Sequence, residues 1–101
     1  MTKAERAHLV AVQALHCIIC RKAGLESPAE VHHVTEAGRR LGHMMHTLGL
    51  CPRHHRGKVG IHGMGRKAFE REYGTQKDLL AETQRLLGAA NGHMEQRSPL
   101  D

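Results

Sequence analysis

Large side chains are scarce in this sequence of 101 residues. It has no tryptophan, and Phe69 and Tyr73 are its only phenylalanine and tyrosine. Small domains with so few bulky side chains are often stabilised by disulfides or by a structural metal ion. The cysteines number three, and this odd count disfavours a disulfide framework. Because ten histidines accompany them, a fold held together by a metal ion is our first hypothesis.

Long apolar runs are missing as well. No stretch approaches the roughly 20 residues that span a bilayer, and the polar, charged N-terminus does not resemble a secretory signal peptide. Cysteines that are not paired are typical of a reducing compartment. We therefore expect a cytoplasmic protein with no membrane partner.

Acidic residues are outnumbered by basic ones, 10 to 15, which gives a formal charge of +5. A basic domain suits a phosphate backbone, although a merely soluble basic protein would show the same balance. Nothing resembles a base-reading helix, so we expect DNA contacts of low sequence specificity. The alternative is an ordinary solvated basic face. The candidate DNA-binding residues are Arg39, Arg40, Arg53, Arg56, Lys58, Arg66 and Lys67.

Periodicity and capping residues predict a mixed α and β chain. A capping box beginning at Thr2 precedes an amphipathic helix over residues 3–15. β-Branched residues predict a strand over residues 31–35, and a second strand is expected over residues 46–51. The two would form an antiparallel hairpin, with residues 38–42 as loop.

Proline and glycine set the boundaries that follow. Pro52 fits the first position of a short helix, and residues 57–65, with four glycines, are expected to be loop. A helix over residues 67–73 would then end at Gly74.

The end of the chain is expected to lose regular structure. Thr75 would cap a last helix that Gly88 stops. We therefore predict one domain over residues 1–88 and a disordered tail over residues 89–101.

The three cysteines fall into a pattern typical of a zinc site. Cys17-x2-Cys20 is followed, after thirty residues, by Cys51-x2-His54. Two such pairs can surround one tetrahedral Zn²⁺ ion. The pattern uses every cysteine, so we predict a structural zinc that replaces the missing aromatic core. The alternatives are three buried reduced cysteines or a redox pair.

Five further histidines lie near the predicted hairpin and the short helix after it. Successive helical residues are about 100° apart, so His55 can face away from the zinc ligand His54 and toward the first strand. A strand histidine opposite a helix histidine is the layout of a ββα-metal site. The histidines that this layout could use are His32, His33, His46, His55 and His62, while His8, His16, His43 and His93 are expected on the surface.

Three segments resemble the HNH nucleases, also called His-Me finger or ββα-metal nucleases. They are Glu30-Val31-His32-His33, Leu50-Cys51-Pro52-Arg53-His54-His55-Arg56-Gly57 and Gly60-Ile61-His62-Gly63. Over about residues 5–87 the chain is similar in particular to the recombination-enhancement, or Ref-type, RecA-dependent nucleases of phages and prophages. The resemblance implies an α+β, zinc-stapled ββα-metal domain with flanking helices and the activity of a metal-dependent DNA endonuclease. It also implies a role in recombination or DNA processing inside a bacterial host cell.

The resemblance implies a role for each histidine of this group. His32, His55 and His62 would hold a catalytic divalent cation, and His33 would be the general base. The base-orienting residue of the family is often Asn, and His46 is its nearest substitute here. Adjacent strand residues point to opposite faces, so His32 and His33 can share a site only where the strand ends or bulges. Imidazole ligands favour Zn²⁺, Ni²⁺ or Mn²⁺ over Mg²⁺, and the sequence leaves the choice open.

Two functions without catalysis also fit the sequence. One is a zinc-stapled nucleic-acid-binding module, and the other is an adaptor that recruits a recombinase filament. DNA is the expected partner, a recombinase filament is a second one that the resemblance suggests, and the sequence does not indicate the oligomeric state.

Overall fold

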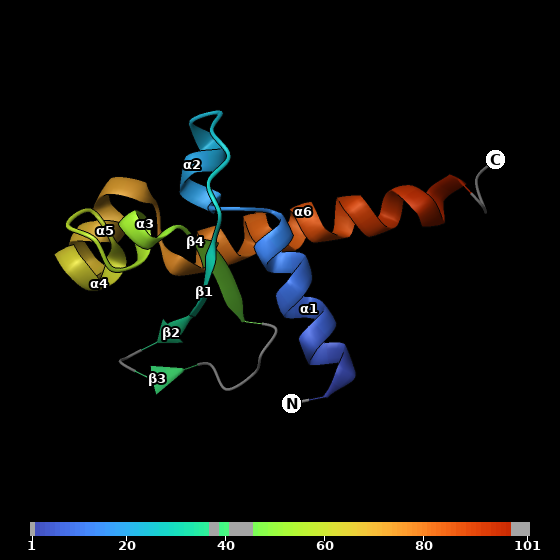
Figure 1. Ribbon diagram of the computed structural model, residues 1–101, viewed down its shortest axis with the longest axis horizontal. Coiled ribbons are helices and arrows are strands. Elements are labelled where there is room, and N and C mark those ends of the chain that lie inside the picture. Colours follow the sequence, from blue (N-terminus) through green and yellow to red (C-terminus); the bar gives the residue numbers. More distant parts are fainter. Residues whose placement is uncertain (1, 37–38, 41–45, 98–101) are drawn as a thin grey trace.

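A two-stranded antiparallel sheet lies at the centre of a small α+β fold, with helices on several sides (Figure 1). The computed structural model describes residues 2–36, 39–40 and 46–97; at residues 36, 39, 40 and 90–97 it describes the backbone alone. Strand β1 (Glu30–His33) pairs with β4 (Thr47–Leu50), with His33 opposite Thr47. The predicted hairpin is therefore present.

A second short ladder extends the hairpin. Strand β2 (Thr35–Glu36) pairs with β3 (Arg39–Arg40), so the prediction of a loop at residues 38–42 is wrong for Arg39 and Arg40. The chain leaving β1 stays extended beyond His33 and pairs with the returning chain. Periodicity could not predict this ladder because each strand has only two residues.

Two helices precede the sheet. Helix α1 (Lys3–Ala14) begins with the predicted capping box: the Glu5 backbone N–H donates to Thr2 Oγ1 at 3.0 Å, and the Thr2 N–H donates to Glu5 Oε1 at 2.7 Å. Helix α2 (Ile18–Lys22) is short and begins directly after Cys17. The Cys17 sulfur accepts the Cys20 N–H at 3.5 Å and so takes the place of the usual capping oxygen.

Two short helices follow the sheet. Helix α3 (Pro52–His55) forms as predicted, but α4 (Ile61–Met64) lies where the sequence predicted only loop. Ile61 is buried in the core, which anchors this helical turn. Gly63 packs so closely that an added Cβ would lie 1.8 Å from the Gly57 carbonyl oxygen. At this position glycine serves close packing rather than flexibility.

The last two helices are α5 (Arg66–Tyr73) and α6 (Gln76–Arg97). Helix α5 ends at Gly74 as predicted, and Thr75 Oγ1 accepts the Asp78 N–H at 3.0 Å at the start of α6. Helix α6 continues through Gly88 and projects beyond the sheet (Figure 1). Glycine weakens a helix by about 1 kcal/mol but does not by itself end one. No helix in the described ranges is both long and apolar enough to cross a membrane.

The two aromatic side chains connect the core to the cysteine cluster. Phe69 is fully buried among aliphatic side chains from β4 and α6. The Tyr73 ring lies 4.9 Å from the Phe69 ring and 5.3 Å from the ring of His54, which it meets edge to face. The aliphatic side chains buried with them include Ile18, Val34, Leu48, Leu50, Ile61 and Leu79.

Candidate metal centres

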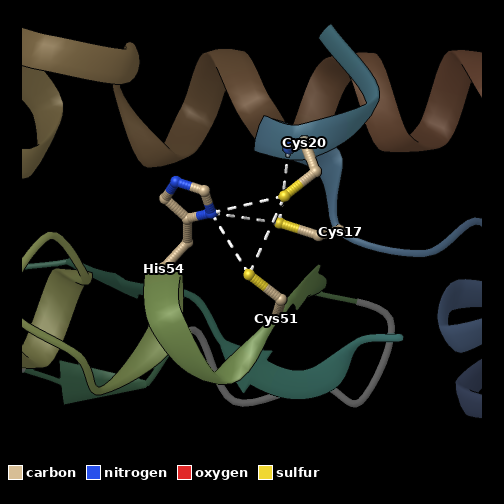
Figure 2. A group of neighbouring side chains, drawn as sticks. All are labelled: Cys17, Cys20, Cys51 and His54. Carbon is tan, nitrogen blue, oxygen red and sulfur yellow. Dashed lines mark hydrogen bonds between the residues drawn. The ribbon is translucent and has the colours of Figure 1, made fainter. Parts of the chain in front are cut away.

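The predicted zinc ligands form one buried cluster. Cys17 and Cys20 come from the start of α2, and Cys51 and His54 come from the start and the last turn of α3. Figure 2 shows the three sulfurs and the His54 ring pointing toward one another across the gap between these helices. All four residues are buried, between 0% and 7% exposed.

The separations in this cluster fit a tetrahedral zinc ion. The Cys20 and Cys51 sulfurs are 3.9 Å apart, and the three sulfurs lie 3.6, 3.6 and 3.2 Å from His54 Nδ1. A tetrahedral ion with its usual bond lengths puts two sulfurs about 3.8 Å apart and a sulfur and a nitrogen about 3.5 Å apart. The cluster can therefore hold a zinc ion with four protein ligands, which leaves no open position.

Burial makes Cys17 costly to deprotonate without a cation. Loss of water around Cys17 raises the pKa of its thiol to about 11. Zinc binds the thiolate, so binding must release that proton. The arrangement therefore couples the packing of α2 against α3 to occupation of the site.

Three other histidines form a second cluster. One ring nitrogen from each of His32, His55 and His62 lies within 4.8 Å of the other two. The ring centres are 5.3 Å apart from His32 to either partner and 4.8 Å apart from His55 to His62. Strand β1, helix α3 and helix α4 each provide one of them.

Hydrogen bonds outside this cluster orient two of its rings. His55 Nδ1 lies 2.8 Å from Glu30 Oε1. Arg56 donates three further bonds to the same carboxylate, from Nε at 3.1 Å to Oε1 and 3.2 Å to Oε2, and from Nη2 at 2.9 Å to Oε2. These hydrogen bonds from Arg56 and His55 lower the pKa of the Glu30 carboxyl to about 2. An ionised carboxylate can only accept, so His55 Nδ1 carries a proton, and in the neutral ring Nε2 then keeps a free lone pair.

Burial favours the neutral form of His32. The residue is only 4% exposed, and loss of water lowers the pKa of its ring to about 4. Its Nε2 lies 2.9 Å from Oε1 of Gln76, at the start of α6. A neutral imidazole is the form that binds a metal. The donor set therefore fits a divalent cation, with three imidazoles where a catalytic site usually has three protein ligands.

The histidine cluster lies in a cleft of about 480 Å³. His33 lines the same cleft as His32, although the two residues are neighbours on β1. Strand β1 ends at His33, and β2 begins two residues later at Thr35. The complete lining is Val31, His32, His33, Thr35, His55, Ile61, His62 and Arg66.

His46 does not line this cleft. Its backbone carbonyl accepts the Val34 N–H at 2.9 Å, just beyond the β1 and β4 ladder. The role of orienting the base therefore stays a prediction for His46.

The predicted DNA-binding residues differ in what surrounds them. Arg66 lines the cleft and pairs with Glu70 at 2.8 Å, while Arg56 pairs with Glu30 at 2.9 Å. The side chains of Arg39 and Arg40 lie outside what the structure describes. The exposed candidates are Arg53, Arg56, Lys58, Arg66 and Lys67.

The comparison with known families covers most of the chain. The family model for recombination-enhancement, RecA-dependent nucleases matches residues 1–88. The chain belongs to this family. No curated protein matches it. Membership in the RecA-dependent nuclease family supports a nuclease role in recombination and interaction with DNA and RecA.

The sequence pointed to the ligands of both clusters but missed one residue behind them. Gln76 contacts His32 from 44 positions further along the chain. No spacing rule connects a strand histidine to the first residue of a distant helix. Glu30 lies in the HNH-like segment, two residues before His32, but its contact with His55 forms only in the folded hairpin.

Proposed function

We propose that this RecA-dependent nuclease family member is a metal-dependent DNA endonuclease of the HNH, or ββα-metal, type. It hydrolyses phosphodiester bonds with low sequence specificity in phage or prophage recombination. The observation that carries this proposal is the cluster of His32, His55 and His62 in a cleft that His33 also lines. The order β1, β4, α3 supports the ββα assignment, since β1 and α3 both supply cluster residues.

In the proposed reaction the protein provides a general base and groups that bind phosphate. His33 takes a proton from water, which attacks phosphorus while the bond to the 3′ oxygen breaks, and the leaving 3′ oxygen takes a proton from solvent. An unperturbed imidazole titrates near pH ~6.5, so a neutral one is available as a base at neutral pH. The products carry a 5′-phosphate and a 3′-hydroxyl.

His32, His55 and His62 would hold the divalent cation, which would supply positive charge at the phosphate, where negative charge grows in the transition state. Arg66, which lines the cleft, binds a neighbouring phosphate. Together with the other exposed cations it gives affinity for the backbone without reading bases. One such cleft cuts one strand, so double-strand cleavage would need two cuts or a second copy.

Nicking of supercoiled plasmid tests the proposal. The zinc-loaded protein is assayed with added Mg²⁺, Mn²⁺, Ni²⁺ or Zn²⁺, each with and without RecA filaments on DNA. We expect nicking with at least one ion. His33→Ala should reduce nicking by about 10²-fold or more, the contribution typical of a general base, while its zinc content and circular dichroism stay unchanged.

His8→Ala on α1 is the matched control, because His8 does not line the cleft. This variant should nick at the wild-type rate. If His33→Ala also nicks at that rate, the assignment of the base is wrong. If the wild-type protein binds DNA or RecA filaments but nicks under no condition, the chain is a binding module or an adaptor instead.

A further inference from the structure

Gln76 is a buried polar residue that neither cluster includes. It is the first residue of α6 and is only 2% exposed. Its side chain crosses to the end of β1 and the start of β2, where it makes four polar contacts with two residues. It lies behind His32 and does not line the cleft. Any effect on chemistry there must pass through another residue.

The backbone of Thr35 determines which way the Gln76 amide points. The Thr35 N–H, which can only donate, lies 3.2 Å from Gln76 Oε1. The Thr35 carbonyl oxygen, which can only accept, lies 3.1 Å from Gln76 Nε2. An amide turned the other way would bring donor against donor and acceptor against acceptor. The amide oxygen therefore faces His32.

The orientation of this amide fixes the proton on His32. Gln76 Oε1 is an acceptor 2.9 Å from His32 Nε2, so the imidazole must donate from Nε2. A neutral ring protonated at Nε2 has its free lone pair on Nδ1. Glu30 acts on His55 in the corresponding way, through the other ring nitrogen.

We propose that Gln76 is a positioning residue for the histidine cluster: it holds His32 in the tautomer that presents Nδ1 as the metal-binding nitrogen. Partners of this kind orient ligand rings and typically change metal affinity 10- to 100-fold when they are removed. The importance of this role for cleavage rests on the proposed function. The tautomer itself does not.

The alternative is that Gln76 only satisfies the Thr35 backbone groups. Two substitutions separate these roles. Gln76→Met removes the acceptor for His32 and all three hydrogen bonds with Thr35. Gln76→Glu keeps an oxygen acceptor for His32 and for the Thr35 N–H but loses the donor to the Thr35 carbonyl.

The first measurement is the tautomer of His32 in the zinc-loaded protein, from ¹⁵N shifts of its ring nitrogens at neutral pH. The second is the affinity of the histidine cluster for Ni²⁺ or Mn²⁺ by calorimetry. We expect Nε2–H in the wild-type protein and in Gln76→Glu. Gln76→Met should show a mixture of tautomers and bind the ion 10- to 100-fold more weakly.

Nδ1–H on His32 in the wild-type protein would overturn the proposal, and this measurement needs no variant to fold. The proposal would also be overturned if Gln76→Met kept the wild-type tautomer and ion affinity. The same would follow if Gln76→Glu weakened ion binding as much as Gln76→Met does. If tautomer and affinity respond as expected while no protein nicks DNA, the role of Gln76 stands and the proposed function fails.

Discussion

The cysteine cluster and the histidine cluster both use helix α3: His54 belongs to the first cluster and its neighbour His55 to the second. All four residues of the first cluster are buried, whereas the second has one buried, one half-buried and one exposed residue. Four protein ligands close a metal site, while three leave room for water or substrate. This difference supports the proposal that the first cluster stabilises the fold and that the second carries the chemistry.

The residues that surround the two clusters differ as well: those around the cysteine cluster are apolar, and those behind the histidine cluster are polar. His54 packs edge to face against Tyr73, which in turn packs on Phe69, so the cysteine cluster is continuous with the core. The rings of His32 and His55 are instead held by polar partners, Gln76 and Glu30. Apolar packing excludes water from a structural ion, whereas hydrogen bonds orient ligands that must stay accessible.

The largest effect is expected when the cysteine cluster is broken. Cys51→Ala should abolish folding, because zinc binding contributes about 10–16 kcal/mol in small zinc domains and whole domains are stable by only about 5–15 kcal/mol. Circular dichroism and bound zinc per chain measure this. His62→Ala, in the other cluster, should leave both unchanged. A folded, zinc-free Cys51→Ala protein would remove the structural assignment.

The next largest effect is expected from a substitution that shifts α4 and leaves the cysteine cluster in place. Gly63→Ala forces a Cβ against the Gly57 carbonyl, so α4 must shift and carry His62 with it. We expect destabilisation of more than about 1 kcal/mol and loss of Ni²⁺ or Mn²⁺ binding at the histidine cluster, while the zinc content is retained.

Gly88→Ala is the matched control for this substitution. A Cβ on Gly88 would meet nothing within 4 Å, and the residue lies inside α6. The substitution should raise the free energy of unfolding by about 0.5–1 kcal/mol through helix propensity. Equal effects of the two substitutions in thermal unfolding would show that α4 does not depend on close packing at Gly63.

A smaller effect is expected from the partner of His55. Glu30→Gln removes the negative charge that holds His55 Nδ1–H, and we expect about 10-fold weaker ion binding at the histidine cluster. Zinc content should not change. Glu82→Gln is the control, since Glu82 pairs with Arg85 at 2.7 Å on α6. Calorimetry that finds the same affinity for both variants would show that Glu30 does not tune the cluster.

The sequence predicted the cysteine cluster better than the histidine cluster for a physical reason. A Cys-x2-Cys and a Cys-x2-His pair are local geometries, so spacing alone identifies their ligands. The contact of His32 with His55 and His62 depends on the register of β1 with β4 and on the position of α4. Helix α4 lies in a glycine-rich segment that the sequence predicted to be loop. Resemblance to HNH nucleases supplied these residues where spacing could not.

Features that depend on tertiary contacts could not be predicted from the sequence for the same reason. Gln76 looks like an ordinary first residue of a helix until β1 packs against it. Helix α2 and the ladder of β2 with β3 are too short for periodicity to detect. Helices α1 and α5 were predictable because their caps, Thr2 and Gly74, are local signals.

The smallest effect concerns phosphate affinity at the edge of the cleft. Arg66 is 44% exposed and pairs with Glu70, four residues later on α5. If it contacts one phosphate, Arg66→Ala should lower the slope of log affinity against log salt concentration by about 1 and weaken DNA binding alike for unrelated sequences. Arg85→Ala is matched to it, because Arg85 has a similar ion pair on α6 and does not line the cleft. Fluorescence anisotropy over a salt series measures both variants. An unchanged slope for Arg66→Ala would place the DNA backbone away from this side of the histidine cluster, whereas equal changes in both would show a diffuse basic surface.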